Sequence, residues 1–137
     1  MIPKFRAWLK KEQKMDNEID HISWLEDELY CIGDGITYMV LAEDLVLMQS
    51  TGLKDKNGKE IFEGDILKVA NNDSSWFEVV KYDHEKAMFV SKEVNLKYEV
   101  PETPLYDLFS PYLFKVEVIG NVLEDGDLID SKKTSED

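Results

Sequence analysis

The sequence predicts a mainly-β protein, α+β at most, in which N-terminal antiparallel strands precede a small SH3-like β-barrel. Three observations predict this fold class. Short segments rich in β-branched and aromatic residues recur along the chain. From Gly64 onward, turn signals separate these segments at intervals of about ten residues, as in small barrels and sandwiches. Aromatic residues make up 11% of the chain, which supplies enough large side chains for a core. The SH3-like pattern by itself implies no function.

The first elements follow from local patterns. Residues 3–9 alternate between apolar and polar positions, which predicts a strand. Residues 10–17 are polar and predict a loop. Residues 19–24 and 28–33 favour a hairpin around an acidic turn, with a helical turn over residues 24–30 as the alternative.

The next elements lead to the strongest turn signal of the chain. Residues 36–40 predict a strand, and residues 42–44 a short turn that enters a strand over residues 45–49. In residues 55–60, Asn57-Gly58 predicts a type I′ hairpin turn, in which both central residues have positive φ.

The second half of the chain alternates between turns and short strands. Tight turns are expected at residues 63–65 and 83–86. Residues 102–111 contain two prolines among apolar residues and predict a short helix or a packed loop. The strands expected here are residues 66–69, 76–82, 87–91, 94–100 and 114–123.

These elements divide the chain into three regions of one compact structural unit. Residues 1–53 form an N-terminal β region, residues 54–123 a barrel-like region, and residues 124–137 an acidic flexible tail. The single cysteine, Cys31, excludes an internal disulfide, and its apolar neighbours predict a buried side chain. The three tryptophans are assigned to the core: Trp8, Trp24 and Trp76.

The sequence predicts a cytoplasmic protein. No apolar run reaches the roughly 18 residues that a membrane span needs. The N-terminus lacks the apolar segment of a secretory signal.

Charge is segregated along the chain, whose formal net charge is −13. Residues 1–14 carry a balance of +4, whereas residues 15–53 hold nine carboxylates and neither Lys nor Arg. The basic strand then lies beside the acidic segment within one subunit, or the two patches meet between subunits or with a partner. A strongly negative chain disfavours general binding to nucleic acid, because phosphate is repelled.

The polar motifs predict no catalytic, cofactor or metal site. The glycines and lysines of residues 51–65 lack the spacing of a phosphate-binding loop. They are explained as turn chemistry or as a loop that binds a partner or another copy. His21 and His84 are widely separated, and no third ligand is placed near either. Residues 124–127 lack the ligand pattern of an EF-hand.

Three blocks of sequence resemble a known family. The opening Met1-Ile2-Pro3-Lys4-Phe5-Arg6-Ala7-Trp8, the stretch from Met48 to Val69, and the closing Val116-Glu117-Val118-Ile119-Gly120-Asn121-Val122 are similar to the YopX family of phage and prophage proteins from Gram-positive bacteria. The resemblance implies a mainly-β protein in a prophage setting that forms homo-oligomers. It implies no catalytic residue.

The function expected from the sequence is a non-catalytic phage accessory protein that self-associates and binds another macromolecule, either a host or a phage protein. The alternatives are a regulator that binds nucleic acid, or an acidic mimic of nucleic acid that occupies a host protein. The candidate binding residues are the basic side chains of the first strand and of the central block: Lys4, Arg6, Lys10, Lys11, Lys54, Lys56 and Lys59.

Overall fold

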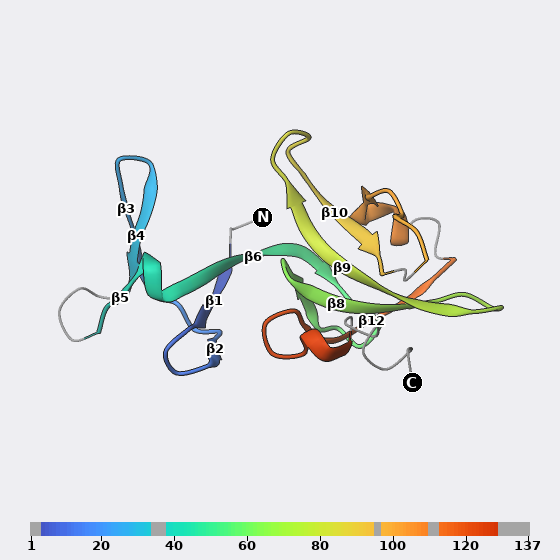
Figure 1. Cartoon of the computed structure of the whole chain (residues 1–137), viewed down its shortest axis with the longest axis horizontal. Helices are drawn as coiled ribbons and strands as arrows, with labels where there is room; N and C mark the ends of the chain where they lie inside the picture. Colours follow the sequence, from blue (N-terminus) through green and yellow to red (C-terminus); the bar gives the residue numbers. More distant parts are fainter. Residues whose placement is uncertain (1–3, 34–37, 95–96, 110–112, 129–137) are drawn as a thin grey trace. The chain divides into compact units, whose positions relative to one another are not determined.

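The structure is a computed structural model that describes residues 4–33, 38–94, 97–109 and 113–128 (Figure 1). It divides the chain into two compact units, Met1–Ser50 (unit 1) and Thr51–Asp137 (unit 2), whereas the sequence led us to expect one structural unit with an internal boundary after residue 53. The division falls inside a strand, so this strand begins in unit 1 and ends in unit 2. Each unit is described by itself below.

Unit 1 contains two groups of short antiparallel strands. β1 pairs with β2 on one side and with the first half of β6 on the other, where Phe5 faces Gln49 and Leu9 faces Leu45. A second sheet has the order β3-β4-β5, and a 3₁₀ turn, η1, connects β5 to β6. The elements are β1 (Phe5–Leu9), β2 (Lys14–Asp16), β3 (Ile22–Leu25), β4 (Glu28–Ile32), β5 (Val40–Leu41), η1 (Ala42–Asp44) and β6 (Leu45–Lys54).

The core of unit 1 lies between β1, β4 and β6. Ala7, Leu9, Ile32 and Leu45 are buried, and residues of β3, β4 and β5 pack against them. Arg6 and Trp8 of β1 are buried as well, and Phe5 is partly buried.

Unit 2 is dominated by one curled antiparallel sheet of order β11-β10-β9-β8-β12 (Figure 1). Its core consists of apolar residues from these strands, from β7 and from the 3₁₀ turn η2: Ile61, Leu67, Val69, Val80, Leu105, Leu108, Val116 and Val118. The elements are β7 (Glu60–Phe62), β8 (Asp65–Ala70), β9 (Ser75–Asp83), β10 (Met88–Glu93), β11 (Thr103–Pro104), η2 (Leu105–Leu108), β12 (Lys115–Asn121) and η3 (Gly126–Leu128).

The predicted class is confirmed: the protein is mainly β, and antiparallel N-terminal strands precede a barrel-like sheet. The hairpin around residues 26–28 and the buried Cys31 are also confirmed, and no helical turn forms over residues 24–30. The expected short helix or packed loop over residues 102–111 contains β11 and η2, with Leu105 and Leu108 in the core; residues 110–111 lie outside the described residues.

Several local predictions are wrong. A strand, β2, occupies part of the expected loop over residues 10–17, because the chain turns back at residues 10–13 and pairs with β1. The described residues of the expected strand over 94–100 form none.

Other predictions fall partly outside the described residues. Of the expected tail, residues 124–128 are described and include η3, and residues 129–137 lie outside the described part. Residues 36–37 of the expected strand over 36–40 also lie outside it. Among the described residues, no helix is long and apolar enough to cross a membrane.

The predicted turn type at Asn57-Gly58 is also wrong. Only Gly58 has positive φ, at 82°. The backbone N–H of Asp55 donates to the carbonyl of Lys59 at 2.8 Å, and that of Gly58 donates to the carbonyl of Asp55 at 3.0 Å. These bonds define a three-residue loop that ends in a left-handed glycine, the second common hairpin connection. The wider loop forms because the Asp55 carboxylate holds it from inside.

Candidate functional site

The β3–β4 hairpin exposes large apolar side chains. The exposed fractions are 57% for Trp24, 61% for Leu25 and 46% for Tyr30. Trp24 lies opposite Leu29, and β3 forms the edge of its sheet within the described residues. In Figure 1 the tip of the hairpin points away from β1 and β2. Trp24 was expected in the core, but its side chain is exposed. The small three-stranded sheet buries only part of its surface, and Trp24 lies outside that part.

The turn at the tip of this hairpin is conformationally strained. Its central residues, Glu26 and Asp27, have φ values of 52° and 67°. Positive φ at both positions is what a two-residue type I′ turn requires, and Asn-Gly satisfies it most easily. Asp also tolerates the left-handed region, so the cost of about 1–2 kcal/mol falls mainly on Glu26. The chain therefore forms this tight turn with two carboxylates where other residues would be more stable.

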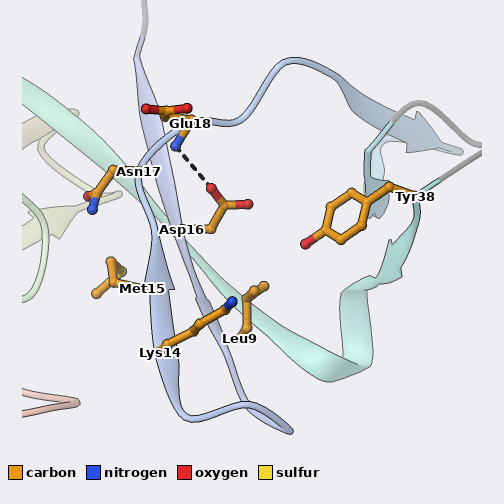
Figure 2. A pocket seen from close by; sticks show the side chains of 7 residues that line it. All are labelled: Leu9, Lys14, Met15, Asp16, Asn17, Glu18 and Tyr38. Atoms are coloured by element: carbon orange, nitrogen blue, oxygen red, sulfur yellow. Dashed lines mark hydrogen bonds between the residues drawn. The ribbon is translucent and has the colours of Figure 1, made fainter.

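A pocket lies near the base of the hairpin, where the Tyr38 ring is directed toward β2 (Figure 2). Its volume is about 360 Å³. The Asp16 carboxylate lines it and accepts a hydrogen bond from the backbone N–H of Glu18 at 2.9 Å. The lining side chains are Leu9, Lys14, Met15, Asp16, Asn17, Glu18 and Tyr38.

The environment of Tyr38 is negatively charged. Partial burial raises the pKa of its phenol, and the nearby carboxylates of Asp16 and Glu12 raise this pKa further. Both causes disfavour the phenolate, so the ring keeps a neutral hydroxyl beside the carboxylates. The carboxylates give the side of the pocket beside Tyr38 a negative potential, and Lys14 also lines the pocket.

Gly33 positions Tyr38 in this pocket. Its φ is 102°, and a Cβ at this position would collide with the carbonyl oxygen of Tyr38. The Gly33 N–H donates to the carbonyl of His21 at 3.0 Å, which ties this contact to the base of the hairpin. A smaller cavity of about 150 Å³ shares Asp16, Glu18 and Tyr38 with the first and continues to His21.

We call the combination of the hairpin and the Tyr38 pocket the hairpin–pocket surface. It consists of four exposed aromatic or apolar side chains and six carboxylates. The members are Trp24, Leu25, Tyr30 and Tyr38, together with Asp16, Glu18, Asp20, Glu26, Asp27 and Glu28. No group of three metal-ligating side chains occurs within the residues that the structure describes.

The seven basic residues singled out in the sequence are divided between the two units. Arg6 is buried, and its Nη2 lies 3.8 Å from Met48 Sδ, so the prediction that it contacts a partner at the surface is wrong. Lys4, Lys10 and Lys11 are exposed in unit 1. The exposed lysines of the central block all belong to unit 2: Lys54, Lys56 and Lys59.

Several of these lysines interact with acceptors of their own unit. Lys10 Nζ donates to the carbonyl of Glu43 at 3.1 Å, and Lys11 pairs with Asp44 at 3.5 Å. Lys56 pairs with Glu117 at 3.6 Å. The basic first strand thus lies beside part of the acidic segment within one subunit, the first of the two arrangements expected.

The central block has a structural role that the sequence did not reveal. Asp55 is buried, and its carboxylate accepts from the backbone N–H groups of Asn57, Lys59 and Val118 at 2.8–2.9 Å. Burial raises the pKa of Asp55, but these three hydrogen bonds and the nearby Lys59 lower it below its usual value. One carboxylate therefore shapes the loop and joins it to β12.

Sequence reasoning missed the hairpin–pocket surface, although one signal was present. Trp24 and Leu25 directly precede three consecutive carboxylates, and no Lys or Arg occurs between residues 15 and 53. An apolar pair next to unneutralised charge indicates an exposed hairpin more than a core strand.

The fold and this surface define a class of protein: a small, mainly-β chain of two compact units, with exposed apolar side chains beside carboxylates in one unit and a curled antiparallel sheet in the other. The family model for the YopX protein matches residues 4–130, and the chain belongs to the YopX family.

Two solved structures are similar over nearly the whole chain. Protein EF1440 from Enterococcus faecalis is 28% identical with a TM-score of 0.60, and the match covers 94% of this chain and 99% of that one. YopX from Bacillus subtilis is 20% identical with a TM-score of 0.60, over 90% of this chain and 95% of that one, and shows the same fold. No protein with a curated description matches the chain.

Proposed function

We propose that this chain is a non-catalytic accessory protein of a phage or prophage, which acts in the host cytoplasm by binding another macromolecule through unit 1. The observation that carries the proposal is the exposure of Trp24, Leu25 and Tyr30 on one hairpin. Grouped large apolar side chains on the surface of a soluble protein mark interaction sites. Aromatic side chains are also the usual anchors of protein interfaces.

The buried carboxylates support a non-catalytic role, because hydrogen bonds within the fold occupy them. Asp65 accepts from the backbone N–H of Phe62 at 2.8 Å. Glu78 accepts from Trp76 Nε1 at 2.7 Å and from Ser91 Oγ at 2.6 Å. A general acid or base needs a carboxyl group that can exchange a proton with a substrate. These groups, like Asp55, support the sheet of unit 2 instead.

The experiment compares two double variants in a quantitative pull-down from host cells. Trp24→Ser with Leu25→Ser removes the exposed pair of the hairpin. Tyr106→Ser with Leu113→Ser removes a matched exposed pair from unit 2, whose side chains are 64% and 66% exposed. We expect a partner that is retained by the wild type and by the control pair and lost with the hairpin pair. Equal retention by all three proteins would contradict the proposal.

Self-association is a second candidate, favoured by the edge strand β3. Natural edge strands are commonly protected by Lys, Pro or a covering segment. The exposed residues of β3 include Trp24 and Leu25 instead. Light scattering tests this role: an oligomer that the hairpin pair of substitutions dissolves would support it, and a wild-type monomer unaffected by salt would exclude it.

Binding to nucleic acid has weaker support. Of the seven basic residues proposed for it, Arg6 is buried, and three lysines already contact oxygen acceptors of the protein. A mobility shift of DNA or RNA that is lost progressively with salt would favour this role over the first.

A further inference from the structure

The structure also indicates the chemistry of the partner, an inference that rests on the proposed function. We infer that the hairpin–pocket surface docks a basic segment of another protein, with a Lys or Arg side chain of that segment entering the pocket beside Tyr38.

Four carboxylates of this surface are not neutralised by the part of their own subunit that the structure describes. Among the described residues, Asp20, Glu26, Asp27 and Glu28 form no ion pair with Lys or Arg. Lys14 lies at the pocket, but its ammonium is 4.0 Å from the carboxylate of Glu12. A bound basic segment would supply the missing positive charge and would be attracted over a distance.

The strained turn supports a binding role for the tip. Glu26 holds a positive φ at a conformational cost, and together with Asp27 it carries two carboxylates to the end of the exposed hairpin. Strained backbone occurs preferentially at functional sites, where the side chain and not stability determines the residue. At this tip, the property that would serve binding is the negative charge of Glu26 and Asp27 next to Trp24 and Leu25.

Charge also distinguishes between possible occupants. A second copy that docked tip to tip would bring two sets of three carboxylates together, from residues 26–28 of each copy. Like charges at an interface disfavour association, and phosphate would be repelled in the same way. A basic protein segment with apolar side chains complements both the exposed apolar residues of the hairpin, Trp24 and Leu25, and the carboxylates that follow them.

The Tyr38 pocket offers a specific position for one cationic side chain. Its volume of about 360 Å³ falls at the lower end of the range for ligand pockets. An aromatic ring attracts a Lys or Arg side chain by cation–π interaction. The Asp16 carboxylate on the facing strand would pair with the same cation. The raised pKa of Tyr38 is consistent with the negative potential that this arrangement needs.

The test measures binding of a labelled synthetic peptide of Lys, Arg and Leu by fluorescence anisotropy at physiological salt, with a peptide of Glu and Leu as the negative probe. One triple variant removes charge from the tip: Glu26→Gln, Asp27→Asn and Glu28→Gln. The control removes the same number of exposed charges from unit 2: Asp73→Asn, Glu85→Gln and Asp107→Asn. We expect the tip variant to lose about tenfold or more in affinity, equivalent to about 1.4 kcal/mol, and the control to lose less than about threefold.

The pocket is tested separately. Tyr38→Ala removes the ring, whereas Tyr38→Phe keeps it; we expect the first to weaken peptide binding about tenfold and the second to retain it. Circular dichroism verifies that each variant is folded.

The comparison of the two triple variants decides the inference. If the tip variant and the control variant lose the same affinity for the peptide, the effect is one of net charge alone, and the inference is overturned.

The outcomes separate the inference from the proposed function. If a Trp24-dependent partner is captured but the basic peptide does not bind, the partner is not basic, and only the inference fails. If light scattering shows a dimer that the Trp24 and Leu25 substitutions dissolve, a second copy covers the surface. If neither the partner nor the peptide binds, both fail.

Discussion

The sharpest stability prediction concerns Asp55, whose carboxylate accepts from three backbone N–H groups in unit 2. In Asp55→Ala these donors lose their acceptor. The N–H of Val118 is buried and would remain unsatisfied, which costs about 1–3 kcal/mol. Those of Asn57 and Lys59 are partly accessible to water and add less. We expect a total loss of about 3 kcal/mol, which lowers the Tm of a unit of this size by roughly 12–24 °C.

Urea and thermal unfolding followed by circular dichroism measure this loss. Asp73→Ala is the matched control, because Asp73 is exposed and its carboxylate holds no comparable loop; we expect it to change stability by less than about 0.5 kcal/mol. Asp55→Asn keeps one oxygen that accepts from the loop, but it turns an amide donor toward the Val118 N–H. Its loss of stability should therefore lie between those of Asp55→Ala and Asp73→Ala. A loss below about 1 kcal/mol for Asp55→Ala would refute the assignment of this carboxylate as the link between the loop and β12.

The pH dependence of stability provides an independent check on Asp55. Its pKa is lowered in the folded state relative to its usual value of 3.8. The carboxylate therefore stabilises the fold fully above that value, and this contribution is lost as the pH falls through the lower, folded-state pKa. The stability difference between the wild type and Asp55→Asn should shrink as the pH falls below about 4. A difference that is constant down to strongly acidic pH would exclude the charge as the cause.

Three further predictions concern unit 1. Replacing the strained tip by Glu26→Asn with Asp27→Gly should stabilise the hairpin by about 1–2 kcal/mol, seen as slower amide exchange in β3 and β4; unchanged exchange would contradict the strain. Gly33→Ala should displace Tyr38 and weaken binding of the basic peptide without affecting the β8–β9 amides in NMR spectra, since its clash is local. Salt should raise the stability of unit 1, whose carboxylates repel one another, and lower its affinity for the peptide; a parallel rise in both would contradict the electrostatic account.

The fold class could be predicted from the sequence because it depends on patterns that are local. Residues 76–82 and 114–123 are rich in β-branched and aromatic residues and lie within or overlap β9 and β12. Residues 94–100 alternate between apolar and polar positions, but their described part forms no strand, since β10 ends at Glu93 and pairs with β11 instead. Alternation predicts that a segment can form a strand, but a partner strand decides whether it does.

The turns illustrate the same limit at the level of single residues. Asn57-Gly58 has the stronger local preference for a type I′ turn, yet Glu26 and Asp27 are the pair with positive φ at both positions. A buried acceptor, Asp55, enlarges the first loop by binding its N–H groups, and this acceptor is held by β12, about sixty residues away. No local preference contains that contact, so the turn type could not be derived from neighbouring residues.

The distribution of polar side chains explains why the candidate site lies in unit 1 and not in the block that identifies the family. In unit 2 the polar residues of the family-like blocks are engaged in the fold: Asp55 joins a loop to β12, and Asn121 accepts from the N–H groups of Leu123 and Glu124. In the hairpin of unit 1, the carboxylates at the tip form no ion pair among the described residues, and Trp24 remains in solvent. A side chain that already makes hydrogen bonds within the fold would have to break them to bind a partner, which would cost stability. The carboxylates and the exposed apolar side chains of the hairpin can bind a partner without that cost. Binding is therefore expected where the fold gains least from the side chains, which is the β3–β4 hairpin.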